Sequence, residues 1–306
     1  MWYKLNRIMM WVNGVEKQVR PTIVLPYLCF TAKQANSTVQ LTKVWSPTAV
    51  SLETSTDWNT WSDYTIWDTI TLSAVWDKVY MRNKSETPTV FGESSSKFYK
   101  FVMTWQIAGS WDINYLLCKE STDTLQSGYC FYYLFQNCAS LTSAPALPAT
   151  TITRYCYMKM FEWTSITVAP ELPATDLTNC DVCYGQMFRG CTSLITAPSL
   201  PATNVANSCY SAMFYMCTSL TQIPALPATY LISGCYNELV RGCSLIKVST
   251  TQDSDYTQAY RVPTTWTWTT SGSNQTKNMF TDTWWTFTGT PSINMTYYVH
   301  KDNVIV

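Results

Sequence analysis

A repeat of about 26 residues fills the middle of the chain and constrains its fold more than any other feature. Each unit follows C-Y-x-x-M-F-x-G-C-T-S-L-T-x-A-P-x-L-P-A-T, and units begin at Cys130, Cys156, Cys183, Cys209 and Cys235. The fifth unit keeps only its first half, and a degenerate sixth one surrounds Met279 and Phe280. One such unit cannot bury its apolar side alone, so successive units stack. The pattern predicts a solenoid that is capped by a degenerate final repeat.

Two kinds of local structure are expected within each unit. Cys183, Met187 and Cys191 lie at i, i+4 and i+8, which predicts one face of a short helix. The S-L-T-x-A-P segment alternates apolar and polar residues and predicts a short strand that ends at proline. The following L-P-A-T reads as an extended connector with φ fixed by its proline.

These repeats resemble the leucine-rich repeats of BspA-type bacterial surface proteins. The resemblance covers roughly residues 128–248 and the terminal echo, and its motif recurs four times in register. It implies a leucine-rich-repeat-like solenoid and a role at a bacterial surface or in adhesion, and similar arrays occur in phages. It implies no catalytic residue, because the function of a repeat protein lies in sites added to the fold.

The first part of the chain has a different character. Short runs of alternating apolar and polar residues, separated by polar turn segments, predict a small antiparallel β-sandwich. Its segment STDWNTWSDYT resembles a hairpin of the β-rich modules that precede such repeats. The strands are expected at Ser37–Leu41, Thr48–Leu52, Thr69–Leu72, Lys78–Met81 and Phe98–Met103. The predicted organisation is an N-terminal arm or docking element, read as two strands or an arm (1–26), the β-sandwich (27–117), the solenoid (118–249), and an insertion loop (250–278) with the degenerate capping repeat, together 250–306.

Charge and hydropathy exclude several classes of protein. Lys+Arg and Asp+Glu number 20 each, so no basic excess exists to neutralise a nucleic-acid backbone. No apolar run is long enough for a membrane helix, and the run Ile8–Val12 is too short for a secretory leader. We therefore expect neither nucleic-acid binding nor membrane insertion, and no Sec export from the chain as it stands.

Twelve cysteines are expected to be small buried thiols and not metal ligands or disulfides. Nine of them occupy repeat positions, and Cys29 and Cys118 are expected in the core of the first domain. The two cysteines of one unit lie too far apart to bridge. Cys180 and Cys183 form a single C-x-x-C, whereas a zinc site needs a second pair.

No set of residues in the sequence indicates catalysis. Common nucleophile, phosphate-binding and metalloprotease motifs are missing, and His300 is the only histidine. The acidic residues Asp57, Asp63, Asp68 and Asp77 are read as solvated turn residues. Asp253 and Asp255 lack calcium-loop spacing and are read as loop residues. We expect no enzyme, no cofactor and no metal, and we assign no binding residue.

The leading functional hypothesis is a non-enzymatic recognition or structural protein. We expect a phage virion component, such as a fibre, tail or capsid decoration, that displays its repeat surface for binding to the host surface. The alternatives are a BspA-like adhesin on a bacterial cell surface and, less favoured, a glycan-active enzyme, which needs two carboxylates at hydrolytic separation. The expected partners are a protein or glycan of a bacterial surface, other virion proteins, or a second copy of the chain.

Tryptophan and glycine counts are unusual together. The chain has 14 tryptophans and only 10 glycines, where glycine is normally about 7% of residues. Trp163 aligns with Gly190 and Gly242 of other units. A glycine codon read as tryptophan, UGA for example, would explain the imbalance. The positions for which we weigh tryptophan against glycine are Trp58, Trp67, Trp76, Trp163 and Trp285.

Overall fold

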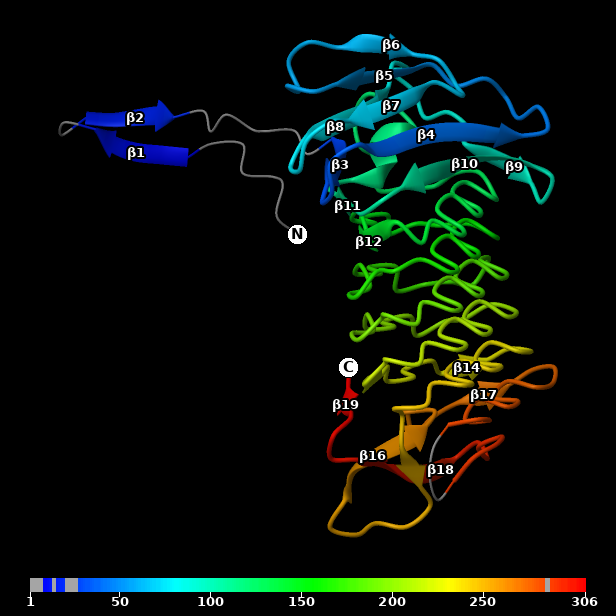
Figure 1. Ribbon diagram of the computed structural model, residues 1–306. Coiled ribbons are helices and arrows are strands. Elements are labelled where there is room, and N and C mark those ends of the chain that lie inside the picture. Colours follow the sequence, from blue (N-terminus) through cyan, green and yellow to red (C-terminus); the bar gives the residue numbers. More distant parts are fainter. Residues whose placement is uncertain (1–7, 13–14, 20–26, 284–286) are drawn as a thin grey trace.

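The computed structural model describes residues 8–12, 15–19, 27–283 and 287–306. Figure 1 shows a layered region of strands at one end, a column of superposed turns in the middle and a smaller strand region at the other end. Among the described residues the only helix is the 3-10 helix η1 (Ile113–Leu116). The chain is therefore mainly β, as predicted.

Residues 27–117, called here the two-sheet region, form two sheets, and the edge strand of the second sheet, β12, is contributed by the first repeat unit. One has the strand order β7-β4-β10-β9 and the other β12-β11-β3-β8-β5-β6. Phe30 of the second sheet and Phe101 of the first are fully buried, with ring centroids 5.0 Å apart, so the sheets share one core. Their strands are β3 (Leu28–Ala32), β4 (Ser37–Val44), β5 (Leu52–Ser55), β6 (Ser62–Tyr64), β7 (Thr69–Leu72), β8 (Lys78–Asn83), β9 (Gly92–Ser94), β10 (Lys97–Thr104), β11 (Ile107–Ser110) and β12 (Leu141–Ser143).

Four of the five strands predicted for this region are present, one is shifted along the sequence, and several observed strands were not predicted. The run Thr69–Leu72 coincides with β7, and three other runs lie within β4, β8 and β10. The strand predicted at 48–52 lies too early in the sequence, because the observed strand β5 begins only at Leu52. Strand β3 was not predicted because all five of its residues are buried, which leaves no alternation to detect.

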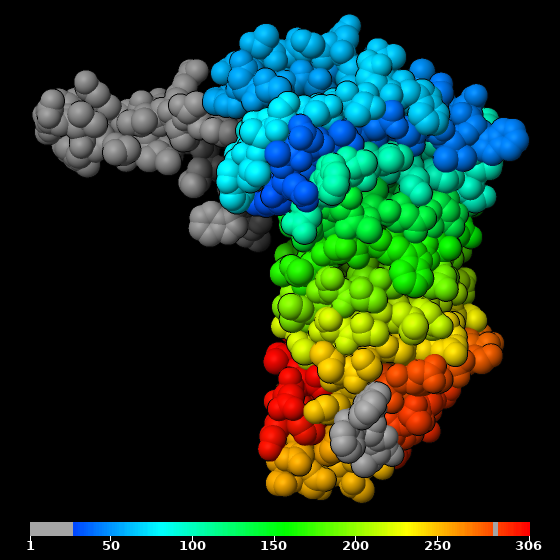
Figure 2. All heavy atoms as spheres, in the orientation of Figure 1, coloured from blue at the N-terminus to red at the C-terminus, as the bar shows by residue number. Residues whose placement is uncertain are grey.

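The repeats lie on one another as a column of turns, which we call the stack (residues 128–249 and 273–283). Figure 2 shows it as successive colour bands from green to yellow. Backbone N–H groups alternate between two partners: Tyr157 donates to Cys183 of the next unit (2.9 Å), whereas Met158 donates to Tyr155 within its own unit (3.3 Å). Every unit is thus bonded to its neighbour through its main chain.

The short helix predicted in each unit is wrong. These segments are consecutive turns in which every fourth residue has a positive φ, for example Val182 (56°), Gln186 (55°) and Gly190 (71°). A turn repeated every four residues brings positions i, i+4 and i+8 to the same side, as a helix does, so the sequence spacing could not separate the two. The buried face was predicted correctly, because Cys183, Met187 and Cys191 are fully buried.

Identical side chains form columns through the stack. The rings of Phe161 and Phe188 lie parallel with centroids 5.7 Å apart, and those of Tyr184 and Tyr210 are 5.6 Å apart. Parallel bridges such as Val168 with Thr196 connect successive units where the sequence predicts short strands. The full aromatic columns are Phe135, Phe161, Phe188 and Phe214, and Tyr157, Tyr184, Tyr210 and Tyr236.

The sixth, degenerate unit lies on the fifth. Tyr236 donates to the carbonyl of Gln275 (2.8 Å) and Gly242 to that of Thr281 (2.9 Å). Met279 and Phe280 are fully buried. The segment 250–278, predicted as an insertion loop, instead contains an extended strand that pairs antiparallel with one near the C-terminus. The strands of this end are β13 (Gln222–Ile223), β14 (Tyr230–Leu231), β15 (Val248–Ser249), β16 (Tyr256–Val262), β17 (Thr269–Thr270), β18 (Met295–His300) and β19 (Val304–Ile305).

Two strands also occupy the described part of the N-terminal arm. β1 (Ile8–Val12) and β2 (Val15–Val19) pair antiparallel. No helix among the described residues has both the length and the apolar character needed to cross a bilayer.

Candidate functional site

The acidic residues singled out in the two-sheet region serve as turn acceptors. Asp57 accepts hydrogen bonds from the backbone N–H groups of Asn59 (2.9 Å) and Thr60 (2.7 Å), and these bonds lower its pKa to about 2. Asp77 accepts from the N–H of Ala74 (2.8 Å), and Asp63 forms an exposed ion pair with Lys84 (2.6 Å). Asp68 lies at a turn, and its main-chain carbonyl accepts a hydrogen bond from the Tyr64 hydroxyl. The carboxylates of Asp57, Asp63 and Asp77 thus have local structural roles, whereas Asp68 contributes its main-chain carbonyl.

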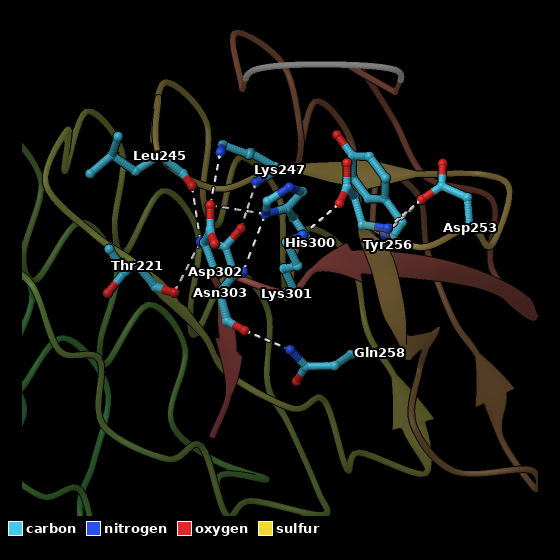
Figure 3. Close-up of polar contacts among 11 residues, drawn as sticks. Thr221, Leu245, Lys247, Asp253, Tyr256, Gln258, His300, Lys301, Asp302 and Asn303 are labelled. Atoms are coloured by element: carbon cyan, nitrogen blue, oxygen red, sulfur yellow. Dashed lines mark hydrogen bonds and ion pairs between the residues drawn. The ribbon is translucent and has the colours of Figure 1, made fainter.

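The second acidic pair belongs to a polar cluster that joins the C-terminal segment to the stack (Figure 3). Asp253 accepts from the N–H of Asp255 (2.8 Å), and Asp255 pairs with Lys301 (2.7 Å). His300 accepts from the N–H of Asp302 through Nδ1 (3.2 Å). These contacts close loops, and among the described residues no group of three or more His, Cys, Asp and Glu is placed to hold a metal ion.

Asn303 is the buried centre of this cluster. Its Nδ2 donates to the carbonyls of Thr221 (3.1 Å) and Leu245 (2.9 Å), and its Oδ1 accepts from the N–H of Lys247 (3.0 Å). Gln258 donates to its backbone carbonyl (2.7 Å). One side chain therefore links the C-terminal strand β19 to two units of the stack, and its role is structural.

All twelve cysteines are free and buried, and burial was predicted for the nine repeat cysteines and for Cys29 and Cys118. In the stack the thiols reach across units: Cys191 lies 2.9 Å from the carbonyl oxygen of Phe161, and Cys217 lies 3.0 Å from that of Phe188. Burial raises the pKa of Cys191 to about 11 and that of Cys138 to about 12. Such thiols stay protonated and are poor nucleophiles. Cys180 and Cys183, the C-x-x-C pair, are both buried.

A groove lies near the C-terminal end of the stack, and we call it the aromatic groove. It has a volume of about 690 Å³ and an uncharged lining. Pairing of β14 with β17 places Tyr230 opposite Thr269, and the orange chain beside β17 projects from the stack there (Figure 1). The lining residues are Thr229, Tyr230, Trp266, Thr267, Trp268, Thr269 and Asn294.

Trp266 is the most exposed aromatic residue of the groove, at 81%. The Arg261 guanidinium carbon lies 4.3 Å from its ring centroid. Arg261 is itself buried and donates to the carbonyls of Pro263 (2.7 Å) and Thr265 (2.5 Å) and to Oδ1 of Asn294. An anchored cation therefore supports one face of an exposed indole ring.

Sequence reasoning did not find this groove. It assigned the segment that contains Trp266 and Trp268 to an insertion loop, and it named no binding residue. The available signal was the W-T-W-T run at residues 266–269, in which two aromatic residues stand among threonines without any charge. Tyr230 comes from a distant unit, and only the pairing of β14 with β17 brings it there.

Among the residues that the structure describes, seven tryptophans adopt a left-handed backbone conformation. Three of them were singled out from the two-sheet sequence, namely Trp58 (φ 58°), Trp67 (84°) and Trp76 (77°). Trp163 of the stack has φ 59°, and Trp285 lies outside the described residues. The sequence did not single out the remaining three, which are Trp45 (55°), Trp105 (57°) and Trp111 (65°).

Comparisons of the chain with protein-family models, with curated proteins and with solved structures found no match.

Proposed function

We propose that this chain is a non-enzymatic recognition and structural protein of a phage particle, in which the stack is a leucine-rich-repeat-like solenoid and the two-sheet region a β-sandwich. The observation that carries the proposal is the bonding of each unit to the next through main-chain hydrogen bonds. Repeats joined in this way form an elongated scaffold that presents an extended surface. The two-sheet region would attach the scaffold to the particle, and the far end would meet the host surface.

The state of the cysteines supports assembly in a reducing compartment. Twelve free, buried thiols suit a protein that folds in the cytoplasm, where virions assemble, because disulfides form in oxidising environments. Cys29 of the two-sheet region and Cys209 of the stack are equally buried, so both parts of the chain share this property.

Mass spectrometry of gradient-purified virions, compared with the envelope fraction of the host cell, tests the proposal. We expect peptides of this chain in virions at a fixed ratio to the major capsid protein. Peptides found in the envelope fraction of cells without phage, and absent from virions, would overturn the virion assignment and support the BspA-like adhesin instead.

A further inference from the structure

The aromatic groove has the composition of a site for a neutral sugar. Its lining combines the rings of Tyr230, Trp266 and Trp268 with threonine hydroxyls and the side-chain amide of Asn294. A pyranose ring offers the matching surface, with C–H groups on its faces and hydroxyl groups around its rim. Tyrosine and tryptophan suit such ligands because each has an apolar body and a polar edge.

The support beneath Trp266 makes the ring available before any ligand arrives. The guanidinium of Arg261 lies against the indole, while its N–H groups are bonded to the carbonyls of Pro263 and Thr265 in the same loop and to the side-chain oxygen of Asn294 before β18. The ring is therefore held without being buried, and it remains 81% exposed. Binding to a ring that is already positioned loses less conformational entropy than binding to a mobile one.

The size and charge of the groove favour a neutral sugar over a protein partner or an anionic ligand. A volume of about 690 Å³ suits a small ligand, whereas a stable protein partner covers about 800 Å² on each side. No charged residue lines the groove. The nearby cation, Arg261, is buried and already engaged by its three acceptors, which disfavours an anionic ligand.

We propose that the aromatic groove binds a neutral pyranose unit of a cell-surface polysaccharide. This proposal rests on the recognition function proposed above and names its ligand class. One face of the sugar stacks on Trp266, and Tyr230, on the strand β14 that pairs with β17, contacts an edge of the sugar. The hydroxyl and amide groups of Thr267, Thr269 and Asn294 supply hydrogen bonds that orient the ring.

Isothermal titration of the full chain with neutral hexose and N-acetylhexosamine oligosaccharides tests this proposal. We expect at least one of them to bind, with Trp266→Ala and Tyr230→Ala each weakening the affinity roughly tenfold or more. Trp45→Gly, which removes an equally exposed indole from the two-sheet region, is the matched control and should leave the affinity unchanged.

Two outcomes would overturn the sugar site. One is that no neutral oligosaccharide binds at millimolar concentration, or that only charged polysaccharides bind. The other is that binding is equally strong in Trp266→Ala. Neither outcome affects the virion assignment, which depends on where the chain is found. Circular dichroism spectra of the variants separate a lost contact from a lost fold.

A different observation concerns the left-handed tryptophans. Within residues 27–117, the non-glycine residues with positive φ are six tryptophans and Asn36, whereas Trp61 is not among them. The region's two glycines, Gly92 and Gly109, have no positive φ either. Glycine is the usual residue in this conformation because a Cβ atom makes it strained. Tryptophan thus occupies the backbone positions that favour glycine.

The turns that carry these residues are fixed by the sheets. Trp67 donates its N–H to the carbonyl of Leu41 (3.0 Å), and Trp76 donates to that of Ala32 (2.9 Å). The backbone therefore cannot change φ without losing these bonds. The rings are 53% and 64% exposed, so burial of the indoles does not compensate for the strain.

Trp163 shows the same mismatch inside the stack. It lies in the column of Gly190 and Gly242, whose φ values are 71° and 73°. Its indole covers Gly190 so closely that a Cβ on that glycine would be 2.4 Å from the ring. Asn137 and Met216 occupy the same column with positive φ, so the position accepts other residues, but the indole of Trp163 is the bulkiest of these side chains.

We propose that glycine is the native residue at positions 45, 58, 67, 76, 105, 111 and 163, and that each codon is a UGA which the source reads as glycine. Trp61 is a true tryptophan in this account. Its ring packs edge-on against Tyr27 at 4.9 Å, and the Arg82 guanidinium carbon lies 3.9 Å from its centroid. The exposed indoles of the two-sheet region are then no ligand-binding surface.

Peptide mass spectrometry of the protein from its natural source, together with the gene sequence, tests this directly. We expect glycine at the seven positions, UGA codons there, and tryptophan with a UGG codon at position 61. Tryptophan in the native peptides, or UGG codons at the seven positions, would overturn the proposal. In recombinant protein, Trp67→Gly and Trp76→Gly should each raise the melting temperature by roughly 2–4 °C, whereas Trp61→Gly should lower it.

Discussion

The two-sheet region and the stack differ in which residues occupy left-handed backbone. In the stack, such a residue recurs every fourth position, and its identity varies from Lys159 and Gln186 to Ala212 and Glu238. In the two-sheet region, left-handed residues lie at isolated corners and are tryptophans with one asparagine. In the stack, main-chain bonds to the next unit hold each turn, and side chains of many types occupy these positions. At an isolated corner, the residue itself must tolerate the conformation.

The largest expected effect comes from the columns of the stack. Phe188 is fully buried between the rings of Phe161 and Phe214. Phe188→Ala should lower the free energy of unfolding by about 3–5 kcal/mol, because it opens a cavity between two rings. Urea denaturation measures the change. Ile195→Ala, at a half-exposed position of the same unit, should change stability by less than about 0.5 kcal/mol. A loss below about 1 kcal/mol in Phe188→Ala would contradict a tightly packed column.

Asn303 tests how firmly the end of the stack is closed. Asn303→Ala removes three hydrogen bonds of a buried side chain and leaves the N–H of Lys247 without its acceptor. The expected loss is about 1–3 kcal/mol. Hydrogen exchange should show it first at β19. Asp302→Asn, an exposed neighbour, is the control. Uniform loss of protection through the two-sheet region would argue that the ends are not independent.

A glycine substitution in the two-sheet region should stabilise it. Trp67→Gly should raise the free energy of unfolding by about 1 kcal/mol, because the strain of a left-handed residue with Cβ is relieved. Asn36→Gly is the matched control, with φ 61° in the same region. Since asparagine tolerates this conformation, its replacement should have almost no effect. Equal effects of the two substitutions in thermal melts would contradict a specific cost of tryptophan.

The thiols of the stack provide a probe of its opening. Burial raises the pKa of Cys138 and Cys243 to about 12, above that of an unfolded thiol. Their stabilising contribution is therefore complete below about pH 8.5 and is lost as the pH rises toward 12. At pH 8 iodoacetamide should label none of the stack cysteines without urea, and stability should fall above about pH 9. Rapid labelling of Cys243 in native protein would reveal local opening.

The smallest effect concerns a single exposed corner. The turn N–H groups of Asn59 and Thr60, with the Ser55 hydroxyl, hold the pKa of Asp57 at about 2. The turn is thus supported above about pH 4, and this support is lost as the pH falls through 2. NMR titration should give a midpoint near 2, and Ser55→Ala should raise it. A midpoint at the ordinary value for aspartate would show that the turn is open.

The sequence repetition predicted that the units stack, but it did not predict the local backbone conformation of each unit. The columns of Phe188 and Tyr184 follow from the register of the repeats. The helix prediction failed because a four-residue turn and a helix place the same residues on the same side. Strand β3 was missed because it is buried on both faces. The aromatic groove required Tyr230 to meet Trp266 across about 36 residues of chain, and no local pattern encodes that contact.

The alternating hydrogen bonds of the stack have a mechanical consequence. Every second N–H of a unit points along the axis to its neighbour, so tension between the two ends loads these bonds together within one junction. Successive junctions carry the same load in series. The weakest junction yields first and releases one unit, or roughly 90 Å of extended chain, while the others remain folded. A protein attached at one end and bound at the other would thus lengthen in discrete steps under strain.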